Sequence, residues 1–212
     1  MTYLGQSLKR AEDPRLITGQ GSFVDDINLP GMLHVAVLRS IHAHALINSV
    51  DTAAARSSPG VALVLTSKDI AGVLRDVPSG DGIYDDKVEH IEAPQHPVLA
   101  RNKVCYVGQP VAMVAAETSY QARDALELIQ VSYEMLPPVV DTINAANEPG
   151  IPIHEETGTN VGIRVRHSGG DLDSAFAQAD RIVSGSYHVQ RLAPSPMENR
   201  GVAADFQAQG GV

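Results

Sequence analysis

The chain has 212 residues, of which 43% are hydrophobic and 19% are charged, enough for one domain of ordinary size or for one domain and part of another. Its formal net charge of -9 excludes a predominantly basic surface, so we expect no nucleic-acid partner. The single cysteine, Cys105, excludes an internal disulfide, and the absence of a CxxC pair excludes the usual zinc and iron–sulfur motifs.

The first 29 residues are polar and rich in glycine, and we expect an extended arm that packs over another part of the protein. The N-terminus lacks the features of a signal peptide, and no later run approaches membrane-span length. We therefore expect a cytoplasmic chain that makes no membrane contact. Asp25 and Asp26 form an adjacent carboxylate pair that could contribute to a metal site. Because no further ligands occur at fixed spacing, turn hydrogen bonding is favoured.

Residues 32–39 alternate along a strand and are largely apolar on both faces, which is typical of a central strand. Further strands are predicted at residues 46–50 and 61–66, and short helices at 52–56, after Asp51, and at 67–70. His42 and His44 lie between the first two strands. Two histidines two residues apart could ligate one metal, but no third ligand is paired with them, so a packing role in the loop is favoured.

Residues 77–97 form a stretch of low hydrophobicity, which we interpret as a long loop that is mobile and suited to contact with a partner. The following stretch, residues 101–138, is the most regular in the chain. It predicts a strand at 104–107, a tight turn around Gly108 and a second strand at 111–116. We expect these two strands to share one layer, and their separation into different layers would count against this interpretation.

A helix is predicted after Thr118, which occupies the position of an N-cap. Its apolar residues recur every three or four positions and form one face, which we expect to pack on the strands: Ala122, Ala125, Leu126 and Ile129. A short strand at 131–133 follows and ends before Pro137 and Pro138, because proline cannot continue a ladder.

The last third of the chain begins with a short helix or an edge strand at 139–146 and a connector rich in proline, glycine and glutamate. A strand at 162–167, a helix capped by Asp171 or Asp173, a long alternating strand at 181–192 and the start of a strand at 202–206 follow. Residues 162–170 could bind an anion, although a simple turn into the helix is favoured. Two prolines stiffen the bend at 194–201, where Glu198 and Arg200 are candidates for a site or, as the favoured alternative, for a structural ion pair.

Four stretches resemble the large, molybdenum-carrying subunit of the xanthine dehydrogenase/aldehyde oxidase family, to which aerobic carbon monoxide dehydrogenase belongs. In chain order they read LKRAEDPRLITGQGSFVDDI, LPGMLHVAVLRSIHAHALINSVD, VGQPVAMVAAETSYQARDALELIQVSYEMLPPVVD and RVRHSGGDLDSAFAQADRIVSGSYHVQRLAPSPMENRGVAAD. Together they cover nearly the whole chain. Ile41 departs from the family, which more often has proline after that serine, and the departure bears on the shape of the loop.

The resemblance implies an α+β protein that begins with an α/β hammerhead domain, a mixed sheet with helices on one face. It implies an N-terminal arm at residues 1–19, the hammerhead domain at 20–146, a linker at 147–159 and the truncated beginning of the molybdenum-binding domain at 160–212. It also implies an oxidoreductase in which molybdopterin-bound molybdenum hydroxylates a carbon centre, or oxidises carbon monoxide, using water. Electrons would then pass to iron–sulfur clusters and FAD on partner subunits.

The family's pterin-binding and base segments lie downstream of every matched position, so the resemblance assigns no catalytic, cofactor-binding or metal residue to this chain. We expect Gln109, Glu198 and Arg200 to line an interface with the remainder of the molybdenum-binding subunit. The expected partners are that remainder, an iron–sulfur subunit, a flavin subunit and, as an option, a second copy. The substrate stays open between a purine, an aldehyde, a heterocycle and carbon monoxide. The alternative is a stand-alone binding or assembly module without redox chemistry.

Overall fold

The computed structural model describes residues 4–78, 88–91, 94–147, 150–165 and 169–206, with the side chains of 88–91 left out of the description. The chain divides into two compact units. One unit comprises Leu33–Ile182, and the other combines Met1–Met32 with Val183–Val212. Each unit is described by itself below. Among the described residues, no helix is long and apolar enough to cross a membrane.

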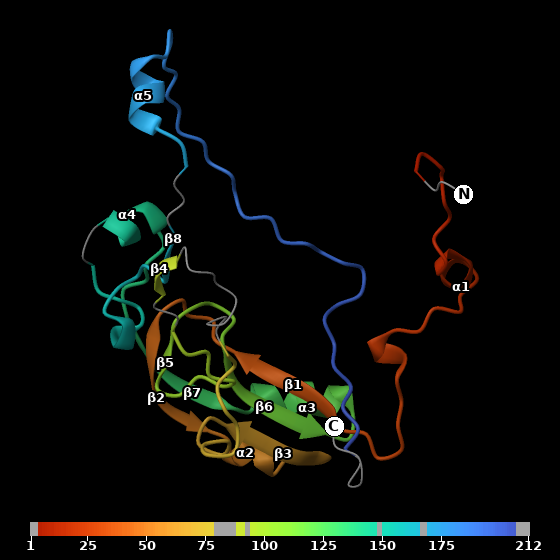
Figure 1. The fold of residues 1–212 in the computed structure, drawn as a ribbon. Helices are drawn as coiled ribbons and strands as arrows, with labels where there is room; N and C mark the ends of the chain where they lie inside the picture. The colour runs from red at the N-terminus through yellow and green to blue at the C-terminus, as the bar shows by residue number, and fades with distance from the viewer. Residues whose placement is uncertain (1–3, 79–87, 92–93, 148–149, 166–168, 207–212) are drawn as a thin grey trace. The chain divides into compact units, whose positions relative to one another are not determined.

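The core of the larger unit is a three-stranded antiparallel sheet in the order β1-β6-β3 (Figure 1). Its strands are β1 (His34–Arg39), β6 (Pro110–Ala116) and β3 (Val61–Thr66). The helices α2 (Ala53–Arg56) and α3 (Ser119–Glu127) contact each other, and α3 packs on all three strands. These elements enclose a cluster of small apolar side chains: Ala55, Val64, Ala112, Val114, Ala125 and Ile129.

The central strand of this sheet is β6, and the prediction that residues 32–39 form the central strand is wrong. The sequence of β6 is almost wholly apolar, and its side chains are buried or half-buried on both faces, which suits a strand with a neighbour on each side. In contrast, β1 pairs only with β6 among the described strands, and its Val35 side chain is 59% exposed. An apolar sequence on both faces therefore does not by itself make a strand central.

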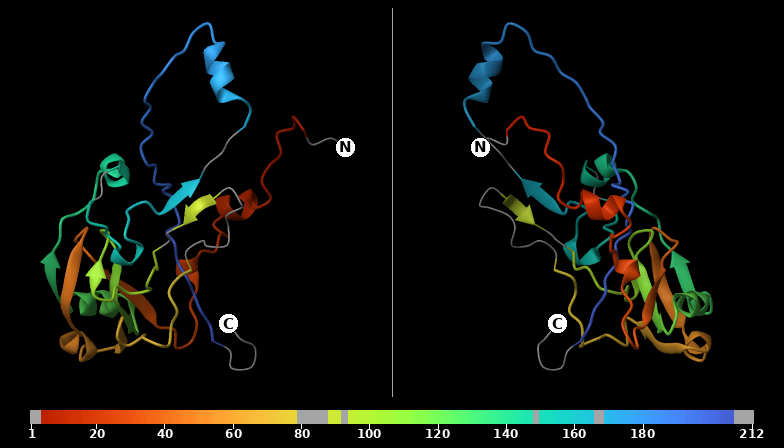
Figure 2. Two further views of the ribbon diagram at one scale, coloured as in Figure 1. Left: turned by 60° about the vertical axis from the view of Figure 1, so that its left-hand side comes forward. Right: turned by 90° about the vertical axis from the view of Figure 1, so that its right-hand side faces the viewer.

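A second antiparallel sheet has the order β5-β2-β7, with β5 (Lys103–Val104), β2 (Ala45–Asp51) and β7 (Gln130–Met135). Ala45 and Val104 of this sheet form a second buried cluster together with Ala100 and with Val111 of β6. Val50 and Val131 pack against both clusters, so the two sheets share part of their packing. Figure 2 shows the strands of this unit from two further sides.

The two runs 104–107 and 111–116 do not share a sheet, and this prediction is wrong. After β5 the chain turns a corner at Gly108, whose φ of 90° is in the left-handed region that favours glycine, and it enters the other sheet as β6. The side-chain Oε1 of Gln109 accepts a hydrogen bond from the Cys105 backbone N–H at 2.7 Å and closes this corner. Val104 and Val111 still meet in one apolar cluster.

The helix α3 confirms the prediction made from its sequence pattern. Thr118 is its N-cap, and the Thr118 Oγ1 accepts a hydrogen bond from the backbone N–H of Gln121 at 3.2 Å. Ala122 and Ala125 are fully buried on its inner face. Residues 67–70, in contrast, form turns and not the predicted helix. There the Asp69 carboxylate accepts hydrogen bonds from the N–H and the hydroxyl of Thr66, which favours a turn.

The rest of the larger unit is built from short elements. The strand β4 (Val88–Ile91) pairs antiparallel with β8 (Ile163–Val165). It lies inside the predicted long loop 77–97, of which residues 79–87 and 92–93 fall outside the described residues. The remaining elements are α4 (Thr142–Asn147), the 3-10 helix η2 (Glu155–Thr157) and α5 (Leu172–Ala177). Asp171, one of the two predicted caps, is the N-cap of α5.

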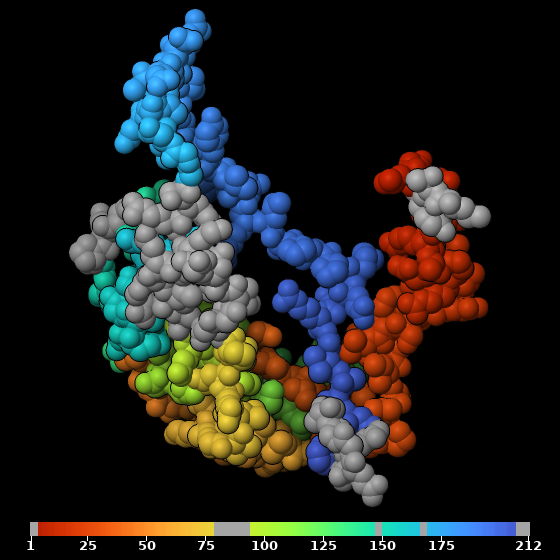
Figure 3. Space-filling view, viewed as in Figure 1, coloured from red at the N-terminus to blue at the C-terminus, as the bar shows by residue number. Residues whose placement is uncertain are grey.

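The smaller unit contains α1 (Asp13–Ile17), the 3-10 helix η1 (Val24–Asp26) and the segment 183–206, which has no regular element. The predicted strands at 181–192 and 202–206 are therefore wrong. A strand needs a neighbouring ladder to satisfy its backbone groups, and the described residues provide none for this segment. Residues 183–206, drawn in blue in Figure 3, are exposed throughout, including the Tyr187 side chain at 89%.

The predicted α+β class is confirmed, with helices packed on the first sheet. The strand pairings differ from the expected mixed sheet, because every pairing between the described strands is antiparallel. The connections explain this difference. Parallel neighbours need long crossover connections, usually with a helix. The helical connection through α3 leads from β6 in the first sheet to β7 in the second, so it does not join neighbouring strands of one sheet.

Candidate functional site

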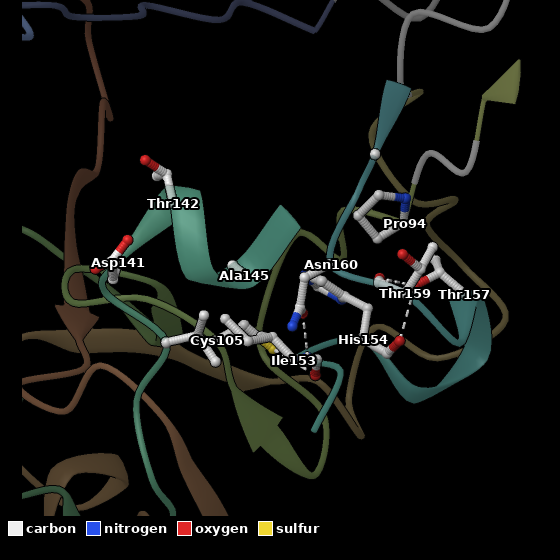
Figure 4. Close-up of a pocket in the computed structure, with 12 residues that line it drawn as sticks. Pro94, Cys105, Asp141, Thr142, Ala145, Ile153, His154, Thr157, Thr159 and Asn160 are labelled. Atoms are coloured by element: carbon white, nitrogen blue, oxygen red, sulfur yellow. Dashed lines mark hydrogen bonds between the residues drawn. The ribbon is translucent and has the colours of Figure 1, made fainter. Parts of the chain in front are cut away.

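Two neighbouring cavities in the larger unit have volumes of about 260 and 590 Å³. Both are lined by Cys105, His154 and Thr157, so together they make one depression, here called the junction cleft. Its walls come from the end of β5, the residues that follow it and the loop 151–160. Figure 4 shows the smaller cavity, with Cys105 and Ile153 next to one another.

The loop 151–160 is held in shape by its own polar side chains. The Asn160 Oδ1 accepts a hydrogen bond from the Ile153 backbone N–H at 2.9 Å, and its Nδ2 donates to the Ile151 carbonyl at 3.3 Å. The Thr157 hydroxyl donates to the His154 carbonyl at 2.8 Å (Figure 4). Because side chains satisfy several of its backbone groups, the loop keeps a defined conformation without a long helix or strand.

Lys103 connects this loop to the second sheet. Its side chain is only 14% exposed, and its Nζ donates to the Ile153 carbonyl at 2.7 Å. The same ammonium lies 3.3 Å from the Glu155 Oε1. The backbone of Lys103 pairs with Leu46 of β2, so the ammonium is projected from a strand of the sheet.

Burial shifts the pKa of each of the two titratable groups that line both cavities towards the neutral form. Burial lowers the pKa of His154, and the nearby Lys103 and His96 lower it further, while Glu156, whose Oε1 lies 3.5 Å from the His154 Nδ1, opposes this shift. Burial also raises the pKa of the Cys105 thiol. A protonated thiol is a poor nucleophile, so this pair lacks the activation of a cysteine–histidine catalytic site.

The described residues of the junction cleft do not include the donor set of a metal site. Among the described residues, no group of three or more histidine, cysteine, aspartate or glutamate side chains is placed to hold a metal ion. The polar groups around Ile153 are already bonded to one another, which leaves few donors to converge on a cofactor. The cleft is suited to packing and to hydrogen bonding between chain segments.

Gln109, predicted to lie at an interface, is 5% exposed and lines the larger cavity. In addition to its side-chain bond to Cys105, its carbonyl accepts a hydrogen bond from the Ser40 N–H at 2.9 Å. Gln109 thus joins the loop after β1 to the corner between the sheets, and its contribution to an interface with further parts of the protein stays a prediction.

Glu198 and Arg200 lie in the smaller unit, and the contacts of the described residues contain no ion pair between them. Instead, the Glu198 Oε1 accepts a hydrogen bond from the backbone N–H of Val24 at 3.1 Å. Val24 also lies against Gly201, where a methyl group on the glycine would come within 2.7 Å of the Val24 side chain. The bend 194–201 therefore holds the N-terminal arm, while the interface role of Glu198 and Arg200 remains a prediction.

The favoured structural roles of two polar pairs are confirmed. The Asp26 carboxylate accepts a hydrogen bond from the Phe23 N–H at 2.9 Å, which is turn chemistry. The His42 ring packs edge-on against Tyr133 with the ring centroids 4.9 Å apart, and the His44 Nδ1 is 2.8 Å from the Pro137 carbonyl. The His44 Nε2 is buried and has no hydrogen-bond partner among the described residues. For the predicted anion loop, residues 166–168 lie outside the described residues.

The fold is of the α+β class, with the junction cleft in its larger unit. Residues 18–137 match the family model described as "Aldehyde oxidase and xanthine dehydrogenase, a/b hammerhead domain". Residues 153–212 match the model described as "Molybdopterin cofactor-binding domain". The chain therefore belongs to the aldehyde oxidase and xanthine dehydrogenase family, with a hammerhead domain and the start of a molybdopterin cofactor-binding domain.

Known proteins similar to the chain support this assignment. It is 42% identical over 204 residues to the nicotine 6-hydroxylase large subunit of Paenarthrobacter nicotinovorans, covering 96% of this chain and 24% of that protein. It is 39% identical over 211 residues to the carbon monoxide dehydrogenase large chain of Afipia carboxidovorans, covering 92% of this chain and 24% of that protein. The quinoline 2-oxidoreductase structure from Pseudomonas putida 86 superposes with a TM-score of 0.73 at 38% identity, covering 87% of this chain and 23% of that chain.

The chain thus spans about a quarter of the length of these curated relatives. Several of the relatives are named as subunits of larger assemblies, including the 6-hydroxypseudooxynicotine dehydrogenase complex subunit gamma of Paenarthrobacter nicotinovorans. The activities and partners that these names state are properties of the whole relatives.

Proposed function

We propose that this chain is the N-terminal part of the large subunit of a molybdenum hydroxylase, where it serves as a scaffold and is inactive alone. The observation that carries the proposal is the order of the two family matches. The hammerhead match at 18–137 is followed, after the unmatched residues 138–152, by the start of the molybdopterin cofactor-binding match at 153–212. Single relatives align with 96% of the chain, so one continuous ancestral segment accounts for it.

The chemistry of such an enzyme is the oxidation of a carbon centre with water at molybdenum bound to molybdopterin. The described residues of this chain supply no ligand set for that metal, so we assign them no step of the reaction. Their proposed contribution is to hold the first segment of the cofactor-binding region on a rigid sheet. The proposed domain boundaries remain residues 1–19, 20–146, 147–159 and 160–212.

The proposed partners are the remainder of the molybdenum-binding subunit, an iron–sulfur subunit and a flavin subunit that carries FAD, all in the cytoplasm. The exposed apolar side chains of the segment 183–206 support a covering partner, because a soluble protein rarely leaves a long apolar segment in water. Val183, Val189 and Val202 are 89%, 85% and 91% exposed.

The proposal is tested by purifying the chain under native conditions from its own cells through an affinity tag. Molybdenum and iron are measured by elemental analysis, and pterin and flavin by fluorescence. We expect all four to co-purify in stoichiometric amounts, together with substrate-dependent dye reduction. The isolated 212-residue chain should contain none of them and show no turnover.

A colourless monomer or homodimer, free of molybdenum and of any partner, would instead support the alternative of a stand-alone binding or assembly module. Turnover by the isolated chain in rigorously metal-free protein would also contradict the proposal. The substrate is identified in the same preparation by comparing purines, aldehydes, aromatic heterocycles and carbon monoxide as reductants.

A further inference from the structure

The nearly buried ammonium of Lys103 bonds to a segment fifty residues away in the chain. Its Nζ donates to the Ile153 carbonyl at 2.7 Å and lies 3.3 Å from the Glu155 carboxylate. The lysine side chain is 14% exposed, whereas that of Glu155 is 77% exposed. An exposed carboxylate contributes little to an ion pair, so the hydrogen bond to the carbonyl is the stronger attachment.

The group that Lys103 holds belongs to a preformed loop. Both backbone polar groups of Ile153 are hydrogen-bonded. Its N–H donates to the Asn160 Oδ1 at 2.9 Å, and its carbonyl accepts from the Lys103 ammonium. The Thr157 hydroxyl bonds to the His154 and Thr159 carbonyls at 2.8 and 2.9 Å. The Ile153 carbonyl that Lys103 holds is therefore part of a loop with several hydrogen bonds of its own.

The contact between Lys103 and Ile153 joins two regions of the chain that match different family models. Lys103 lies within the hammerhead match, which ends at residue 137, and Ile153 is the first residue of the cofactor-binding match. Residues 138–152 match neither family model. Lys103 and Ile153 thus bridge the two matched regions across their connector, and the pairing of β8 with β4 is a second attachment of the same region.

We propose that Lys103 is a positioning residue that latches the start of the molybdopterin cofactor-binding region to the hammerhead domain. Its consequence for a cofactor rests on the proposed function, whereas the latch itself is a property of this chain. Lysine suits the role because its long side chain lines the junction cleft. Its ammonium has several N–H donors, which can bond to a carbonyl and a carboxylate at the same time.

The latch is tested by amide hydrogen exchange in the 212-residue chain, followed by mass spectrometry of peptides. Lys103→Met keeps the length of the stem and removes every donor. We expect it to speed exchange in peptides covering 151–165 by about tenfold or more, the effect of losing a hydrogen bond to a charged donor. Peptides covering β6 and α3 should be unchanged. Lys68→Met, at an exposed lysine, is the matched control and should change neither region.

Glu155→Gln separates the two bonds, because it removes the carboxylate charge and leaves the Ile153 carbonyl in place. It should change exchange in 151–165 less than Lys103→Met does. Equal exchange of this region in Lys103→Met and in the wild type would overturn the proposal. So would faster exchange spread evenly over the chain, because that would show a general loss of stability and no local latch.

The consequence for the cofactor is measured separately in the complete large subunit with its partners. Lys103→Met is expected to lower the molybdenum and pterin content per subunit, with Lys103→Arg restoring part of it. Wild-type complex without molybdenum would sink the proposed function and leave the exchange result in the chain standing. Full cofactor content in Lys103→Met, beside a loaded wild type, would overturn the positioning role alone.

Discussion

In the junction cleft, burial shifts the pKa of Cys105 and His154 more than the charged neighbours do. For both Cys105 and His154, the largest cause of the pKa shift is the loss of water around the charged form. The neighbouring charges of Lys103 and Glu156 modify these shifts in either direction. Two measurements follow from this arrangement.

The Cys105 thiol is expected to react slowly with iodoacetamide. Its pKa is raised above the ordinary value of 9.0 by burial, so little thiolate is present near neutral pH. We expect alkylation at pH 8 to be about tenfold slower or more in the folded chain than in urea, a ratio that follows from reduced thiolate and access. The rate is measured by mass spectrometry, and equal rates in both states would contradict this account. Because the folded pKa is raised, the contribution of the half-buried thiol to stability is lost as pH rises above 9.0.

The imidazole of His154 is expected to titrate below its ordinary pKa of 6.5, and Glu156→Gln should lower this pKa further, because Glu156 stabilises the imidazolium. A depressed histidine pKa means that the unfolded chain binds the proton first. Stability is therefore lost as pH falls from 6.5 towards the folded pKa. An NMR titration of the ring protons measures both values. The matched variant Glu117→Gln, at an exposed glutamate outside the cleft, should leave the titration of His154 unchanged. A rise of the His154 pKa in Glu156→Gln would contradict the stabilising role of Glu156.

At the scale of elements, α3 shows how a short helix is stabilised by one cap. Thr118→Ala removes the hydrogen bond that the Gln121 N–H donates to the Thr118 hydroxyl oxygen, and it should lower the free energy of unfolding by about 1 kcal/mol. Urea denaturation measures the difference. Thr52→Ala is the control, because the Thr52 hydroxyl at the N-cap of α2 accepts a hydrogen bond from the Arg56 side chain at 3.0 Å but makes no capping bond. A loss at Thr118 no larger than that at Thr52 would show that the cap is not what holds α3.

The elements that the sequence pattern predicted correctly are those set by local chemistry. The strand β3 begins and ends at the predicted residues, and Thr118 and Asp171 cap the helices that follow them. The sequence pattern predicts a helix at 67–70, where the structure has turns. The Asp69 carboxylate accepts the hydrogen bond of the Thr66 N–H, which favours the turn. Local propensity is weak where one side chain can replace a backbone hydrogen bond.

What the sequence pattern could not predict depends on partners distant in the chain. Both apolar runs around Gly108 were recognised, but nothing local told which sheet each would join. The contact of Lys103 with Ile153 gave no signal, because a lysine and a backbone carbonyl fifty residues apart form no motif. Gln109 was singled out through a family resemblance, and the structure places it in the cleft, but its hydrogen bond to Cys105 was not foreseen.

At the scale of the whole molecule, the two units differ in how well they bury their apolar residues. The larger unit contains both apolar clusters, whereas the segment 183–206 in the smaller unit leaves its valines, Tyr187 and Phe206 mostly exposed. A chain with alternating apolar residues and no ladder partner is an incomplete strand. The alternating pattern of residues 181–192 predicts a strand, but a strand needs a neighbouring strand to pair with. The described residues provide no such strand, so the prediction is wrong for this chain.

This reasoning gives a prediction for the complete large subunit, where we expect further strands to cover residues 181–192. A cysteine introduced by Val189→Cys should react with a maleimide rapidly in the 212-residue chain, because Val189 is 85% exposed there. In the complete subunit the same cysteine should react about a hundredfold more slowly, the scale of protection typical of a residue in a stable strand. Val73→Cys, at a valine that is 77% exposed in the larger unit, controls for general reactivity and should react alike in both. Equal labelling of Val189→Cys in the two proteins would show that the segment stays uncovered, and the scaffold would then have to meet its partners through another surface.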